Sequence, residues 1–256
     1  MKKRLQFIDD FEKRAEAQLM EEFQSEVGLF EQAIDILTNS VARIGLDLNG
    51  PQPISPEEIL ASGDAKLIRV TAASALLCEF MFRLWASRRL LRSGYVSRAM
   101  ACLRDALEAL KYSDICRNDV KQSTRWLSSR RIRTQGLQVH PEISEAYDLL
   151  YQWLSQVGVH AHSLAADTSK VYFVSREGDD IVRLGSMATM LVATGAFIDY
   201  VLGAYDDFLR QERALRAELR RVSALLSKEI RKLSKAAVCV GIQLRIPSPK
   251  NDPHCQ

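Results

Sequence analysis

Several features that would classify a chain quickly are missing from this sequence. Its five cysteines are scattered and never form a Cys-x-x-Cys pair, which argues against a disulfide framework and a zinc knuckle. The absence of a Gly-rich phosphate loop and of internal repeats excludes a P-loop nucleotide site and a repeat solenoid. No apolar run of signal-peptide length follows the basic residues at the N-terminus. We therefore expect a cytoplasmic protein that folds in a reducing compartment.

A strong charge bias is also missing. The 256 residues are 47% apolar and 26% charged, which is the composition of an ordinary globular protein rather than a disordered one. The formal net charge of +3 is too small to indicate a nucleic-acid-binding protein by itself. Any electrostatic argument must therefore come from local clusters of charge.

Long uncharged apolar runs are lacking as well. A membrane span takes about twenty apolar residues. Residues 67 to 85 contain Glu79 and Arg83, and residues 184 to 205 contain Asp199. Because a charge near the middle of a lone span is costly, we interpret both segments as buried core helices and expect no membrane partner.

The apolar residues that are present follow a helical period over most of the chain, so we predict an all-α helical bundle. The clearest stripe alternates steps of four and three residues: Phe23, Val27, Phe30, Ile34, Leu37, Val41, Ile44 and Leu48. It predicts a long N-terminal helix over roughly residues 3 to 48, within residues 1–50, and the sequence Asn49-Gly50-Pro51 is the signal that ends it.

Residues 55–205 form the predicted helical core domain. Ser55, followed by Pro56 and two glutamates, indicates a helix start. Two β-rich runs around a Gly-containing turn predict a small β-hairpin near residues 171–184. Residues 206–236 are predicted to extend the last helix beyond the core. The proline-rich residues 237–256 are expected to be a disordered tail.

The two long terminal helices predict self-association. Their apolar stripes, from Phe23 to Leu48 and from Val201 to Leu233, are longer than a compact domain can cover. The first helix is acidic and the last is basic, which favours pairing them with each other. We therefore expect a homo-oligomer, such as a dimer with coiled-coil pairing, unless the two helices fold back on each other within one subunit.

Two short motifs resemble those of HEPN-like all-α bacterial proteins. The first is the Arg-x-x-x-Glu step of Arg104 and Glu108, and the second is Tyr151-x-x-Leu-Ser155 followed by His160. The resemblance implies a helical bundle that often dimerises and takes part in RNA cleavage or nucleotide binding in toxin–antitoxin and anti-phage systems. The active members carry an Arg shortly before the His, whereas residues 154 to 158 contain none. The resemblance therefore leaves RNA cleavage open.

Through this resemblance, His160, Arg104 and Glu108 are the candidate catalytic residues. His160 would act as a general acid or base, and Arg104 would stabilise charge on a phosphate, without a metal ion or another cofactor. Nearby candidates for binding are Tyr151, Ser155 and His162. The alternative is structural: Arg104 and Glu108, four residues apart, can pair on one helical face, and His160 can be a hydrogen-bonded residue at a helix end.

Two basic clusters are candidates for contacting a phosphate backbone. Residues 117 to 133 hold six basic residues against one acid, with a tryptophan available for stacking on a base. The candidate binding residues of this cluster are Arg125, Trp126, Arg130, Arg131 and Arg133. Residues 210 to 235 hold nine basic residues against three acids. The alternative for both clusters is solvation, because outward helix faces are commonly charged.

Two functional hypotheses follow. The first is a HEPN-like helical protein that binds RNA or nucleotide near Arg104, Glu108 and His160, and that would be a metal-independent ribonuclease if it is an enzyme. The second is a non-enzymatic helical interaction protein. In that case the apparent motif stabilises the bundle, and the terminal helices pair within or between subunits.

Overall fold

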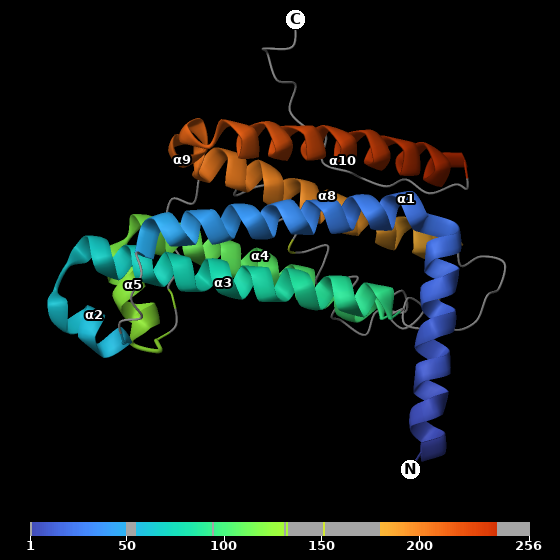
Figure 1. The fold of residues 1–256 in the computed structure, drawn as a ribbon, viewed down its shortest axis with the longest axis horizontal. Helices are drawn as coiled ribbons and strands as arrows, with labels where there is room; N and C mark the ends of the chain where they lie inside the picture. The colour runs from blue at the N-terminus through green and yellow to red at the C-terminus, as the bar shows by residue number, and fades with distance from the viewer. Residues whose placement is uncertain are drawn as a thin grey trace, which may run out of the picture.

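The computed structural model describes residues 2–49, 55–93, 95–130, 132, 151 and 180–239. Regular structure in these ranges is α-helical, in agreement with the predicted all-α class. The helices are α1 (Lys2–Asn49), α2 (Pro56–Ser62), α3 (Ala65–Arg92), α4 (Val96–Asn118), α5 (Val120–Leu127), α8 (Asp180–Ala204), α9 (Asp206–Gln211) and α10 (Arg213–Cys239). The long helices pack lengthwise against one another as a bundle, with α2 and α5 at one end (Figure 1).

The apolar stripe of α1 lies at the centre of the main core. The predicted stripe residues whose side chains are described are all buried: Phe23, Val27, Phe30, Ile34, Leu37, Val41 and Ile44. α1 packs against α3, α8 and α10. Burying one large apolar side chain contributes about 1.5–3 kcal/mol, so this stripe fixes the positions of three other helices.

α1 changes direction at Phe23. The backbone there has φ −130° and ψ 33°, outside the helical region. The segment before Phe23 projects from the bundle, whereas the segment after it lies along the other helices (Figure 1). The Phe23 side chain is 5% exposed and belongs to the main core. Leu19, one turn before the bend, is also buried in this core, so the bend lies just after α1 enters the core.

The predicted helix start at Ser55 is confirmed. Ser55 Oγ accepts a hydrogen bond from the Glu58 backbone N–H at 3.2 Å, and the Ser55 N–H donates to Glu58 Oε2 at 3.0 Å. This reciprocal arrangement is a capping box. Gly63 ends α2 with a φ of 65°, a left-handed conformation that glycine adopts without steric cost. Asp64 then caps α3 by accepting from two backbone N–H groups of its first turn.

The predicted β-hairpin near residues 171–184 is wrong. Residues 180 to 184, which include its second run, lie in α8, and no strand occurs in the ranges that the structure describes. Residues 171 to 179 lie outside those ranges. The second β-rich run lies in the first turns of α8, a helix that fills the main core with Met187, Leu191, Phe197 and Val201. Tertiary packing therefore overrides the local strand preference.

The last predicted helix is divided into α8, α9 and α10. The backbone leaves the helical region at Tyr205 (φ −118°, ψ 28°) and at Glu212 (φ −92°, ψ 60°). At the first break, the Arg117 guanidinium of α4 donates to the Ala204 carbonyl and lies 4.8 Å from the centre of the Tyr205 ring. A cation at a helix C-terminus satisfies a free carbonyl and favours the end of the helix there.

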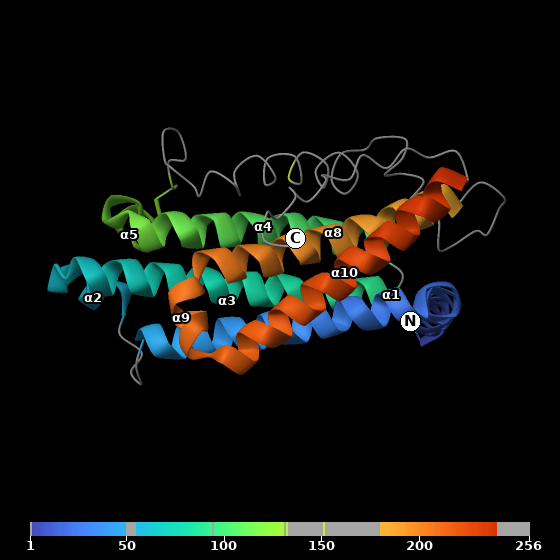
Figure 2. The ribbon, with the colours of Figure 1, turned by 90° about the horizontal axis from the view of Figure 1, so that it is seen from above.

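Because of these breaks, α10 runs back along α8 and α1 (Figure 2). The helical residues within 206–236 are thus packed in the bundle and do not extend beyond it. Of the predicted disordered tail, residues 237 to 239 belong to α10, and residues 240 to 256 lie outside the described residues.

The terminal helices pair within one chain. Nη1 of Arg43 in α1 lies 2.6 Å from Oε2 of Glu212, and Nζ of Lys232 in α10 lies 3.6 Å from Oε1 of Glu26 in α1. The apolar stripe of α10 is buried in the same core: Leu215, Leu219, Val222, Leu226 and Leu233. The stripes that motivated the expected homo-oligomer are therefore covered inside the subunit, and self-association stays a prediction.

Both segments that were tested as membrane spans contribute to the core. Among the described helices, α8 is long and apolar enough to cross a membrane by length and composition, and 61% of its segment Met187–Ala204 is buried inside the bundle. α3 buries Leu77, Phe80 and Leu84. The Phe80 ring meets the Phe197 ring of α8 edge to face at 5.2 Å between centroids.

Replacing Arg117 by alanine is expected to lower the free energy of unfolding by about 2 kcal/mol. The variant removes the guanidinium hydrogen bonds to the Ala204 carbonyl and to the carboxylate of Asp114. Asp114 is only 3% exposed, so water replaces the lost bond poorly. Hydrogen bonds to charged groups contribute about 1.5–3 kcal/mol. Urea unfolding followed by circular dichroism measures the change, with Tyr205→Phe as a control that keeps the ring beside Arg117. Equal unfolding midpoints for Arg117→Ala and the wild type would contradict this role.

Glu26 is a buried carboxylate at the contact between α1 and α10. It is 5% exposed, accepts a hydrogen bond from Ser25 Oγ at 2.7 Å and lies beside Lys232. Burial raises the pKa of Glu26, but hydrogen bonding and the charge of Lys232 outweigh this and hold the pKa below its ordinary value. A carboxyl group with a lowered folded pKa stabilises the fold above its unfolded pKa, and this contribution is lost as pH falls through the folded pKa.

We therefore expect the wild type to lose free energy of unfolding as the pH falls below about 4.3, the ordinary pKa of a glutamate, and Glu26→Gln to lose less over the same window. Denaturant unfolding at pH 7 and in this acidic window measures both losses. Glu21→Gln, at an exposed carboxylate of the same helix, is the matched control. Parallel acid losses in all three proteins would show that Glu26 is not the responsible group.

Candidate functional site

One face of α4 carries the two residues of the Arg-x-x-x-Glu step. Arg104 and Glu108 are partly buried and lie on this face with Tyr112, because residues four apart are neighbours on a helix. The opposite face of α4 is buried in the main core through Leu103, Leu107 and Leu110. The amphipathic pattern of α4 thus directs the polar residues away from the core.

Arg104 is held by two neighbours. Its guanidinium donates from Nη2 and Nε to Asp105 Oδ1 at 2.7 and 3.1 Å. It also lies 5.9 Å from the centre of the Tyr151 ring, a distance at which a cation and an aromatic face attract. Burial lowers the pKa of Arg104, but Asp105 raises it more, so the side chain is a permanent cation. The structure therefore brings together Arg104 and Tyr151, which the sequence analysis selected from distant parts of the chain.

Glu108 does not form the predicted ion pair with Arg104. Its Oε1 accepts a hydrogen bond from the Tyr112 hydroxyl at 2.8 Å, one turn further along α4. The Arg104 side chain is 23% exposed and uses Asp105 as its salt-bridge partner. The structural alternative of a buried Arg104–Glu108 pair is therefore replaced by two separate pairs on the same helix face.

A pocket of about 540 Å³, here called the α4–α5 pocket, lies where α2, α4 and α5 meet. It is lined by Pro56, Tyr112, Trp126, Leu127, Ser129, Arg130 and Ile132. Three of these side chains, Tyr112, Trp126 and Leu127, pack against a small second core that Ala72, Leu76, Ile115, Cys116 and Ile132 form. Arg130 is exposed, so the pocket combines apolar and aromatic walls with a cation in contact with solvent.

Two of the predicted binding residues, Trp126 and Arg130, thus line one pocket, and Arg125 lies partly buried on α5 beside them. Sequence reasoning missed Tyr112, which joins the pocket to the α4 motif through its hydrogen bond to Glu108. Its spacing of four residues from Glu108 is the signal that could have found it. The other predicted residues, Ser155, His160, His162, Arg131 and Arg133, lie outside the described residues.

The wall of this pocket contains a residue with positive φ. Ser129 has a φ of 56°, in the left-handed region. Its N–H donates to the Trp126 carbonyl, and the next N–H, that of Arg130, donates to the Arg125 carbonyl. These two bonds form the Schellman motif that often ends a helix with glycine. α5 therefore ends with a strained serine, and this turn places Arg130 beside Trp126.

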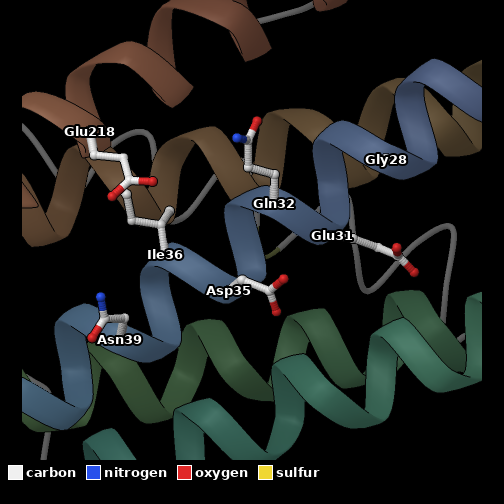
Figure 3. Close-up of a pocket in the computed structure, with 7 residues that line it drawn as sticks. All are labelled: Gly28, Glu31, Gln32, Asp35, Ile36, Asn39 and Glu218. Carbon is white, nitrogen blue, oxygen red and sulfur yellow. The ribbon is translucent and has the colours of Figure 1, made fainter.

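A second depression, of about 390 Å³, follows α1 and includes one residue of α10 (Figure 3). Its lining residues are Gly28, Glu31, Gln32, Asp35, Ile36, Asn39 and Glu218. Two of its carboxylates are neutralised by α3: Arg88 pairs with both Glu31 and Asp35, and Arg92 pairs with Glu31. No group of three or more metal-binding side chains occurs in the described ranges. We interpret this depression as part of the ion-pair contact between α1 and α3.

Searches against protein-family models, curated proteins and solved structures return no match for this chain. The geometry of the α4 face and of the α4–α5 pocket is therefore the basis for a functional conclusion.

Replacing Ser129 by glycine is expected to raise the free energy of unfolding by about 0.5–1 kcal/mol. The left-handed conformation costs an L-residue about 1–2 kcal/mol, which glycine avoids, but glycine loses more backbone entropy on folding and this offsets part of the gain. Thermal or urea unfolding measures the gain. Ser128→Gly is the matched control, since Ser128 has a φ of −85° that needs no glycine. A destabilised Ser129→Gly variant would show that the serine side chain itself supports the turn.

Proposed function

We propose that this chain is a helical nucleotide- or RNA-binding protein that holds a base in the α4–α5 pocket. The observation that supports the proposal is the convergence of Tyr112, Trp126 and Arg130 on one pocket of about 540 Å³. Small-molecule sites commonly have about 300–1,000 Å³ and combine apolar walls with a few polar groups. In this proposal a base stacks on Trp126, and Arg130 contacts the adjoining phosphate.

Stacking on Trp126 is the main source of binding free energy in this proposal. A base that stacks on an aromatic side chain gains about 1–3 kcal/mol, largely independent of the base. Trp126 is partly buried against the small core, so its ring is held in place before the ligand arrives. Glu108, one turn earlier on α4, accepts a hydrogen bond from the Tyr112 hydroxyl and so holds that side chain as well. Aromatic side chains that are held before the ligand arrives lose little side-chain entropy on binding.

The α4 face would extend this site for a longer ligand. Arg104 lies two helical turns before Tyr112, which is about 12 Å along the helix axis. A mononucleotide in the pocket would not reach it, whereas an oligonucleotide could place a phosphate beside Arg104 and a base beside Tyr151. An oligonucleotide should therefore bind more tightly than a mononucleotide.

The resemblance to HEPN-like proteins belongs to the same proposal. It favours RNA as the ligand and a role in bacterial defence or in a toxin–antitoxin pair. RNA cleavage, if present, would use His160 as the general acid or base and would need no metal ion.

A second candidate function is a non-enzymatic interaction protein. The observation in its favour is that Arg104 and Glu108 both have partners within α4, namely Asp105 and Tyr112. Side chains with such partners can have a purely structural role, in stabilising the helix. This alternative predicts no binding of nucleotide or RNA by the wild type.

The test compares Trp126→Ala with Trp85→Ala for binding of AMP and of a fluorescent 12-nucleotide RNA. Trp85 is a 45% exposed tryptophan on α3 that donates a hydrogen bond to Thr38 of α1 and does not line the pocket, so it is the matched control. Trp126→Ala is expected to weaken binding by about 10- to 100-fold, the loss of one stacked base, while Trp85→Ala binds like the wild type.

Tyr112→Phe, which keeps the ring and removes the hydrogen bond to Glu108, adds a mild variant in case Trp126→Ala unfolds. It should retain the fold by circular dichroism and bind AMP and the RNA measurably more weakly than the wild type. Absence of AMP and RNA binding by the wild type would reject the proposal in favour of the interaction protein. Equal effects of Trp126→Ala and Trp85→Ala would move the site away from this pocket.

A further inference from the structure

The nine basic residues of the second cluster, 210 to 235, divide into two groups. Four have acidic partners: Arg210 and Arg216 pair with Asp206, Arg221 lies 4.0 Å from Glu218, and Lys232 lies 2.6 Å from Glu229. The other five are Arg213, Arg220, Lys228, Arg231 and Lys235. In the part of the chain that the structure describes, no ion pair involves any of these five, and all are exposed.

These five residues, here called the α10 cationic face, share one side of the helix. At 3.6 residues per turn they fall within a sector of about 80°. The buried stripe of α10, which includes Leu219, Val222 and Leu226, lies on the opposite side. Arg213 and Lys235 are about 33 Å apart along the axis, at 1.5 Å per residue. The result is a straight row of cations that points away from the bundle.

Solvation alone does not account for this arrangement. Like charges three or four residues apart on a helix repel, and Lys228, Arg231 and Lys235 are spaced in that way. A helix that needed only a soluble surface would mix acids into the row, as α3 does where Arg83 pairs with Glu79 one turn before it. The repulsion would be relieved by an anionic partner.

We propose that the α10 cationic face binds the phosphate backbone of double-stranded nucleic acid. A duplex is a rigid polyanion, with one negative charge per about 1.7 Å of axis, and so complements a straight row of cations. Single-strand sites normally add aromatic side chains on which bases stack, and α10 contains no aromatic residue. Backbone contact without base contact is the mode that this face supports.

A membrane surface is a poorer match. Helices that bind at a membrane surface insert a large apolar face between the lipids. The apolar stripe of α10 is buried in the bundle, and Leu225, 37% exposed, is the large hydrophobic residue that remains accessible on the described part of α10. The cationic face therefore offers charge without an insertable apolar surface.

This surface is separate from the α4–α5 pocket. In Figure 1 α10 lies along one edge of the bundle, while α5 lies at the opposite edge, and Figure 2 again shows them apart. Duplex binding at α10 therefore does not require that the pocket binds a base. The two proposals can fail independently.

The experiment measures fluorescence anisotropy of a 24-base-pair duplex, as DNA and as RNA, from 50 to 200 mM salt. For five phosphate contacts, the slope of log Kobs against log salt should be about −4.5, at about −0.9 per contact on duplex DNA. The variant Arg220→Gln/Lys228→Gln/Arg231→Gln should reduce the slope to about −1.8 and weaken binding by at least about tenfold at 50 mM salt. Binding should not depend on sequence.

The matched control is Lys66→Gln/Arg89→Gln/Arg98→Gln, which removes three exposed cations from α3 and α4. It should leave both the slope and the affinity near the wild-type values, and circular dichroism should show both triple variants folded. The proposal is overturned if the two triple variants weaken duplex binding equally, if the wild type does not bind duplex at 50 mM salt, or if α10 binds anionic phospholipid vesicles and not duplex. Trp126→Ala should bind the duplex like the wild type, which would show that duplex binding at α10 does not depend on the α4–α5 pocket.

Discussion

Burial of the apolar stripe of α1 is the interaction on which the rest of the fold depends. α3 and α4 form one antiparallel pair, and α8 and α10 form another. α1 packs on α3 from the first pair and on both helices of the second pair. The two pairs also touch each other directly, through a smaller contact between α4 and α8. Side chains of α1 such as Phe30 and Leu37 therefore lie in the core that both helix pairs share. The ion pairs of Glu31 and of Glu212 lie around this apolar contact, and as partly exposed pairs they contribute less to stability than the buried stripe.

The candidate site lies apart from that central contact. The pocket beside Trp126 is built on a small core of its own, which includes Leu76, Ile115 and Ile132. Residues in a satellite core can change with little effect on the main core, because the two clusters share few side chains. This arrangement separates what holds the bundle together from what shapes the pocket. It also explains how α5, a helix of 8 residues, can be held firmly enough to present an aromatic ring.

Sequence reasoning succeeded where the signal is local and periodic, and failed where distant residues decide. The stripe of α1 and the cap at Ser55 follow from spacing and residue type alone. The break after Ala204 depends on Arg117, which is 87 residues away, so no local pattern announces it. The β-rich run at residues 181 to 184 has a real strand preference that packing overrides. In the site, Trp126 and Arg130 were found by composition, whereas Tyr112 was missed, although its spacing of four residues from Glu108 places it on the same helix face.

The bend at Phe23 also affects how the molecule moves through solution. Because Leu19 is still buried in the core, the arm comprises residues 2 to 18, which extend about 25 Å from one end of the bundle at 1.5 Å per residue. A body with such an arm has a larger frictional coefficient than a compact particle of 28.9 kDa. It therefore diffuses and sediments more slowly than its mass alone indicates, and a size estimate calibrated on spherical standards overstates the mass of a single subunit.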